Sequence, residues 1–177
     1  KAVGPDYPVM FRIAGHDYME GGNTNKEWTL FAVELEKRGV DAINVTGGWH
    51  ETRVPQLPMS LPRGGLAYLA AGVKAEVQVP VVASNRINDV VVADEILRMG
   101  MADLTGMARA LITDPYLAQK AYEGRYDEIS HCIGCNQGCF DHVFYLQPVT
   151  CMINPRAGRE LEYSVLPAAK PKRVAVV

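Results

Sequence analysis

Short apolar runs alternate with segments of helical period through the first 127 residues of this chain. The expected elements are a strand at 7–15, a helix at 25–39, a strand at 40–48, a helix at 64–77, a strand at 79–85, a helix at 90–100 and a strand at 101–109. Such alternation is typical of a parallel sheet covered by helices, so the fold class is predicted as α/β. Four such units fit half of an eightfold barrel or an open doubly wound sheet, and periodicity does not decide between them.

The helix ends in this region carry recognisable capping residues. Thr24 precedes Glu27 by three residues, as in a capping box, and Gly39 can end the helix that follows. Asn88 or Asp89 can cap the helix at 90–100. These signals indicate where the predicted helices begin and end.

The overall composition excludes several classes of function. Of the 177 residues, 48% are hydrophobic and 21% are charged, and the formal net charge is -2. This balance gives no electrostatic reason to expect nucleic acid or an anionic membrane surface as a partner. No apolar run approaches the length of a transmembrane helix, and the N-terminal residues lack the apolar core of a signal peptide. We therefore expect a cytoplasmic protein.

All four cysteines lie close together after the alternating region. Cys132, Cys135, Cys139 and Cys151 have the spacing C-x2-C-x3-C-x11-C, in a stretch without clean periodicity. Clustered cysteines in a cytosolic chain hold metal or do redox chemistry more often than they form disulfides. A structural zinc site commonly uses two separated pairs of ligands, whereas three crowded thiolates suit an iron–sulfur cluster, in which each thiolate binds a different iron. The spacing therefore favours iron–sulfur, with structural zinc or simple packing of the cysteines as alternatives.

Several short motifs match a known family. They are SNRIND, GMARAL..DP, DEI..CIGCNQGC, C.INPRAG and GWHE, in which dots stand for unmatched residues. Together they resemble the bacterial 2,4-dienoyl-CoA reductases, which are iron–sulfur flavoenzymes of the old yellow enzyme superfamily. The resemblance implies that residues 1–127 are the C-terminal half of an FMN-binding (β/α)8 TIM barrel, that 128–160 hold a 4Fe-4S cluster, and that 161–177 are a linker and the first strand of an FAD/NAD(P)-binding domain. By this comparison the chain is an internal fragment, without the first half of the barrel and the rest of the FAD/NAD(P)-binding domain.

The same resemblance assigns roles to individual residues. Arg12 matches the arginine that meets the flavin ring of FMN, and Arg86, Ala108 and Arg109 match its phosphate and ribityl contacts. His50 matches an active-site histidine that can donate to a developing enolate oxygen or assist protonation. The cysteines match the ligands of the 4Fe-4S cluster. Taken singly, an arginine at a strand end can instead form a rim salt bridge, and a histidine after a strand can be an ordinary loop residue.

The activity implied by the resemblance is reduction of a conjugated C=C bond in an enoyl-CoA, a dienoyl-CoA or another activated alkene. Electrons would pass from NAD(P)H to FAD, then singly through the cluster to FMN, and finally to the alkene as hydride. FMN and the 4Fe-4S cluster would bind this chain, whereas FAD and NADPH would bind elsewhere in the full-length protein. The alternatives are an amine-oxidising flavoenzyme similar to trimethylamine dehydrogenase and a zinc-stapled structural module.

Overall fold

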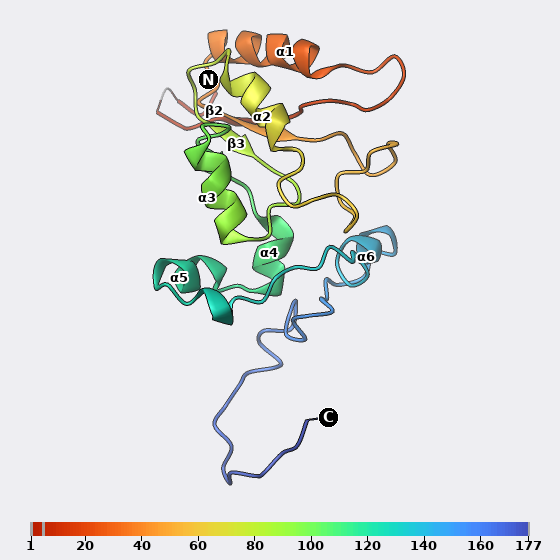
Figure 1. Ribbon diagram of the computed structural model, residues 1–177, viewed down its shortest axis with the longest axis vertical. Coiled ribbons are helices and arrows are strands. Elements are labelled where there is room, and N and C mark those ends of the chain that lie inside the picture. The colour runs from red at the N-terminus through yellow and green to blue at the C-terminus, as the bar shows by residue number, and fades with distance from the viewer. Residues whose placement is uncertain (1, 5, 177) are drawn as a thin grey trace.

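The computed structural model describes residues 2–4 and 6–176, and a parallel sheet lies at its centre (Figure 1). The strands are β1 (Met10–Ala14), β2 (Ala42–Thr46), β3 (Val81–Ala83) and β4 (Leu104–Thr105). They lie in the order β1-β2-β3-β4, and each neighbouring pair is parallel. This sequential order is that of consecutive barrel strands, whereas a doubly wound sheet reverses its strand order partway. The predicted α/β class is therefore confirmed, in its half-barrel form.

Helices follow the strands along the chain. They are α1 (Asn25–Lys37), α2 (Ala67–Lys74), α3 (Val90–Arg98), α4 (Ala108–Thr113), α5 (Leu117–Tyr122), a 3-10 turn (Tyr126–Glu128) and α6 (Phe140–Phe144). The first three occupy their predicted positions, but the strand expected at 101–109 spans only Leu104–Thr105, and the chain enters α4, which the sequence did not indicate, at Ala108. The sequence did not indicate α5 and α6, which are short and have no side-chain cap. Within the described residues, no helix has the length and apolar character needed to cross a membrane.

Side chains cap the starts of α1 and α3. The backbone N–H of Thr24 donates to Glu27 Oε2 at 2.7 Å, which confirms the predicted capping box. For α3 the cap is Asp89, whose Oδ1 accepts the backbone N–H of Val91 at 2.9 Å. Asn88, the alternative cap, is buried and donates instead to the backbone of residues 130–151, which we name the cysteine segment.

The two faces of the sheet differ in polarity. Ile43, Val45 and Val81 point to one face, where they are buried against the helices in one apolar core. On the opposite face, Arg12 lies beside Asn44 in the register of β1 and β2. In a closed barrel this second face is the interior, and the carboxyl ends of its strands form the site. The sheet thus separates a packed core from a polar surface.

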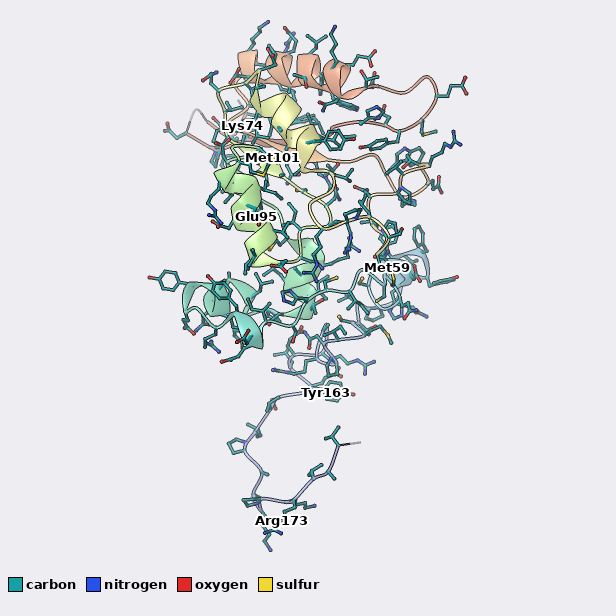
Figure 2. The ribbon with its side chains drawn as sticks, viewed as in Figure 1. Met59, Lys74, Glu95, Met101, Tyr163 and Arg173 are labelled. Atoms are coloured by element: carbon teal, nitrogen blue, oxygen red, sulfur yellow. The ribbon has the colours of Figure 1, made fainter. Side chains whose placement is uncertain are left out.

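A carboxylate ties the helical layer to the sheet. Lys74 on α2, labelled in Figure 2, contacts Asp103 just before β4, with Nζ and Oδ1 2.5 Å apart. The other carboxylate oxygen of Asp103 accepts the backbone N–H of Val81 at 2.9 Å. The hydrogen bond from Lys74 is the main cause that lowers the pKa of Asp103, and the Val81 N–H adds to it. Asp103 therefore joins α2, β3 and the start of β4.

The end of the chain has little regular structure. Residues 161–176 are exposed and form neither helix nor strand, and the chain beyond Tyr163 runs away from the body of the protein (Figures 1 and 2). The strand expected here is not formed in the described chain, because a strand needs a neighbour for its backbone hydrogen bonds. Its assignment to an FAD/NAD(P)-binding domain stays a prediction, as do the domain boundaries.

Replacing Leu69 by Ala should destabilise the apolar core strongly. Leu69 is fully buried on α2 and packs closely on the backbone of Gly15. Such a buried truncation costs about 2–5 kcal/mol in free energy of unfolding. The matched control is Met99→Ala, because Met99 is 73% exposed and its loss should cost less than about 0.5 kcal/mol. Chemical denaturation of the full-length protein measures both, and equal losses would contradict the described core.

Candidate functional site

A cavity of about 680 Å³ opens at the carboxyl ends of the strands. Its wall includes Arg12 on β1, Arg86 after β3, and Ala108 and Arg109 at the start of α4, which are the residues predicted to contact a cofactor. Parallel α/β folds bind ligands at this edge, because each strand delivers its following loop there. The volume lies within the range of small-molecule and cofactor sites. The structure therefore brings these predicted residues to one cavity.

The turn after β3 has an unusual backbone conformation. Asn85 and Arg86 both have positive φ angles, of 76° and 53°, which residues with a side chain rarely adopt. Asn85 Oδ1 accepts the backbone N–H of Gly47, and its Nδ2 donates to Gln56 Oε1, each at 2.9 Å. Arg86 is buried, and its Nε donates to the carbonyl of Leu61 at 2.8 Å. The turn thereby fixes a guanidinium in the cavity wall.

Arg109 connects three parts of the site. From the first turn of α4, its Nη1 donates to the carbonyl of Leu57 at 2.8 Å and to Asn136 Oδ1 at 2.6 Å. Leu57 belongs to the loop between β2 and α2, and Asn136 belongs to the cysteine segment. Asn136 has a φ of 65°, a conformation that asparagine tolerates better than most residues. Arg109 therefore holds the cysteine segment against the strand ends.

Sequence reasoning missed several further polar residues of the cavity wall, among them Asn44, Ser84 and Asn88. Asn44 Oδ1 accepts the hydroxyl of Ser84 at 3.0 Å. Asn88 is buried, its Nδ2 donates to the carbonyl of Cys132, and its Oδ1 has no hydrogen-bond partner among the described groups. An unpaired buried acceptor in a cavity wall fits a donor on a bound molecule. The sequence signal that could have identified these residues is that each is a polar side chain within or just after an apolar strand.

His50 lies beside this cavity rather than in its wall. Its ring centroid is 5.4 Å from that of Phe140 and 5.5 Å from that of Phe144, both on α6. The side chain of His50 is 37% exposed, and its Nε2 is 3.9 Å from Glu51 Oε1. Phe140 itself lines the cavity. The predicted catalytic histidine is thus separated from the cavity by a phenyl ring.

The four cysteines line a second, smaller cavity next to the first. All four are free thiols and partly buried. The rest of the wall consists of Arg109, Ile112, Thr113, Ile133, Asn136 and Ile153. In the part of the chain that the structure describes, no three His, Cys, Asp or Glu side chains form a group that could hold a metal ion. The thiols therefore border one cavity without meeting at one point.

The surroundings of Cys139 and Cys151 act on their thiols in opposite directions. Burial raises the pKa of Cys139, with only partial opposition from a backbone N–H. Burial also acts to raise the pKa of Cys151, but the N–H groups of Asn154 and Ile153 and the hydroxyl of Thr113 outweigh it and lower the pKa overall. Thr113 Oγ1 lies 3.6 Å from the sulfur of Cys151. These hydrogen bonds favour the thiolate of Cys151, which is the form that binds metal.

The two cavities share part of their walls. Arg109, Ile112, Cys132 and Cys139 line both. A group held by the thiols would therefore lie directly beside a molecule in the larger cavity.

A buried carboxylate anchors the start of the cysteine segment. Asp114 follows α4 and is 3% exposed. Its Oδ2 accepts Lys120 Nζ at 2.6 Å and the backbone N–H of Ser130 at 2.9 Å. Burial acts against the charge, but Lys120 and the Ser130 N–H outweigh it and lower the pKa of Asp114 below its usual value. Asp114 therefore ties α4, α5 and the cysteine segment together.

Known proteins are similar to this chain in sequence and in geometry. Residues 1–128 match the NADH:flavin oxidoreductase / NADH oxidase family. Over its whole length the chain is 53% identical to a metal reductase of Desulforamulus reducens and 40% identical to an NADH oxidase of Thermoanaerobacter brockii, and it covers 26% and 28% of those proteins. A solved complex of a 2-naphthoyl-CoA reductase with 2-naphthoyl-CoA matches with a TM-score of 0.90 and 38% identity, over 95% of this chain and 26% of the other. The chain thus spans about a quarter of the length of these relatives.

Replacing Asp114 by Asn should loosen the start of the cysteine segment. Removing one partner of a buried ion pair costs about 3 kcal/mol or more in free energy of unfolding, because the other charge stays buried. Since the folded pKa is lowered, the stabilisation is present above the ordinary carboxyl pKa of about 3.9 and is lost as the pH falls through the folded value. Denaturation of the wild-type protein and of Asp114→Asn between pH 7 and pH 3 measures this stabilisation.

The control for this experiment is Asp94→Asn, which removes an exposed pair with Arg98 on α3. An exposed pair of this kind contributes less than about 1 kcal/mol. The anchoring role would be contradicted if Asp114→Asn lost no more free energy of unfolding than Asp94→Asn. It would also be contradicted if the loss in Asp114→Asn did not shrink at acid pH.

Proposed function

Because the chain belongs to the NADH:flavin oxidoreductase / NADH oxidase family, we propose that it supplies the FMN site and the cluster site of an enzyme that reduces a conjugated C=C bond. The observation that carries this proposal is the wall shared by the two cavities. The parent enzyme would be NAD(P)H-dependent and similar to a 2,4-dienoyl-CoA reductase, with FAD and NADPH bound outside this chain. The CoA ester bound by the related 2-naphthoyl-CoA reductase supports a conjugated acyl-CoA as the substrate class.

The larger cavity fits FMN in the chemistry of its wall. Arg86, Ala108 and Arg109 would hold the phosphate and the ribityl chain, since guanidinium groups bind phosphate with paired hydrogen bonds. Arg12 would lie at the flavin ring, where a cation favours the reduced, anionic form. The unpaired Oδ1 of Asn88 can accept a hydrogen bond from a hydroxyl or N–H of the cofactor. Bound FMN supplies the hydride chemistry that side chains lack.

Cys132, Cys135, Cys139 and Cys151 line the smaller cavity and would supply the four thiolate ligands of a 4Fe-4S cluster. In such a cluster each thiolate binds its own iron, so the thiols need to border one cavity rather than meet at one point. The hydrogen bonds that favour the thiolate of Cys151 prepare it as a ligand. A bound cluster supplies one-electron transfer.

His50 is the residue that we propose for proton handling at the substrate. Phe140 and Phe144 orient its ring at the side of the cavity. An imidazole can donate to the enolate oxygen that develops as a conjugated thioester or ketone is reduced, and it can exchange its proton near neutral pH.

The composition of the purified protein tests the proposal directly. The full-length protein, purified anaerobically, should contain FMN and about four iron and four sulfide per chain. It should oxidise NAD(P)H in the presence of a dienoyl-CoA and should not oxidise trimethylamine. Cys151→Ser should lower the iron and sulfide content, whereas Ser130→Ala should not, because Ser130 uses only its backbone N–H in the site.

Two results would contradict this assignment. One zinc ion per chain without sulfide would replace the cluster with a structural zinc site. Oxidation of an amine without reduction of any conjugated alkene would assign the chain to an amine-oxidising enzyme instead.

Replacing His50 by Ala should slow reduction of the alkene about a hundredfold or more, which is the usual contribution of a positioned acid or base. Reduction of FMN by NAD(P)H should change little, because His50 lies outside the cavity wall. Rapid mixing measures the two half-reactions separately. His142→Ala is the control, since among the described contacts the side chain of His142 on α6 hydrogen-bonds only to the nearby Pro148 carbonyl. Equal slowing of both half-reactions would remove His50 from the substrate side.

A further inference from the structure

Arg109 occupies the boundary between the two cavities. It lines the larger cavity together with the other cofactor residues, and it also lines the cavity of the cysteines. It stands at the start of α4, which in Figure 1 lies between α3 and the cysteine segment. Arg12 and Arg86 line only the larger cavity. Arg109 is therefore the arginine that lines both cavities, and the Arg86 guanidinium also lies against Gly134 of the cysteine segment.

The charge of Arg109 is held in place without being neutralised by its partners. The guanidinium donates to the Leu57 carbonyl at 2.8 Å and to the Asn136 amide oxygen at 2.6 Å, and both acceptors are uncharged. Two hydrogen bonds to separate segments keep the group from swinging away into solvent. A fixed positive charge therefore remains at the shared wall.

The rest of the cysteine cavity strengthens the effect of this charge. Among the described residues that line it, Arg109 is the one charged side chain apart from the thiols. Ile112, Ile133 and Ile153 contribute apolar surface, which lowers the local dielectric constant.

We propose that Arg109, besides contacting FMN, sets the reduction potential of the cluster held by the four cysteines. The inference rests on the proposed function, because it requires both cofactors. One-electron reduction adds one negative charge to the cluster, and a fixed cation beside it stabilises the reduced form and raises the potential. The same cation stabilises the reduced anionic flavin on the other side of the wall. Arg109 thus raises the reduction potentials of both groups.

Redox titration of the full-length holoprotein tests this role, with the cluster followed by electron paramagnetic resonance and FMN by absorbance. Arg109→Gln should shift the redox equilibrium of the cluster about tenfold toward the oxidised form. For a one-electron couple this makes the reduction potential of the cluster about 59 mV more negative. Arg109→Lys keeps the charge and should keep most of the potential. Arg12→Gln is the matched control, because Arg12 lines only the larger cavity: it should lower the potential of FMN and leave that of the cluster unchanged.

A cluster potential in Arg109→Gln equal to that of the wild type would overturn the inference, as would an equal shift in Arg12→Gln. Wild-type protein without iron and sulfide would instead overturn the proposed function. If Arg109→Gln loses its cluster, Ile133→Lys and Ile133→Gln form a second pair, because Ile133 lines the same cavity and is 49% exposed. The lysine variant should then have the higher cluster potential, and equal potentials in this pair would overturn the inference.

Discussion

Parallel pairing of the strands places every carboxyl end at one edge of the sheet, and the candidate site depends on that constraint. The apolar residues of the strands pack in the core beneath the helices, and the polar residues lie on the opposite face of the sheet. Arg12 and Asn44 lie side by side there because the register of β1 and β2 pairs them. The segments that follow β3 and β4 then bring Asn88 and Arg109 to the same edge. One backbone arrangement thus assembles residues that are far apart in the sequence.

The cysteine segment is held in place by side chains at this edge of the sheet. Only a small apolar cluster of Ala110, Leu117 and Ile129 lies at its start. Beyond that cluster, polar contacts hold it: Asn88 donates to the Cys132 carbonyl, and Arg109 donates to Asn136. Asn88 and Arg109 also line the larger cavity. The geometry of the thiols and the geometry of the proposed flavin site are therefore fixed by shared hydrogen bonds rather than by two separate cores.

The sequence predicted those parts of the structure that depend on local pattern. Apolar runs and caps located β1 to β3 and α1 to α3, because burial period and capping are properties of neighbouring residues. The end of β4 was missed, since the apolar pattern continues past Thr105 while pairing with β3 stops there. Resemblance identified the arginines of the cavity, but not that Arg109 also borders the cysteines. The packing of His50 on α6 joins segments distant in the chain, and no local pattern encodes such a contact.

The turn at Asn85 and Arg86 shows what this arrangement costs. Two consecutive residues with side chains are held in the left-handed region, where each non-glycine residue is disfavoured by about 1–2 kcal/mol. Glycine at either position would relieve the backbone, yet it would delete the amide that bridges Gly47 and Gln56 or the guanidinium buried against Leu61. The hydrogen bonds of both side chains offset this backbone cost. The turn therefore holds both side chains in the cavity wall at a cost in backbone conformation, as strained turns at functional sites do.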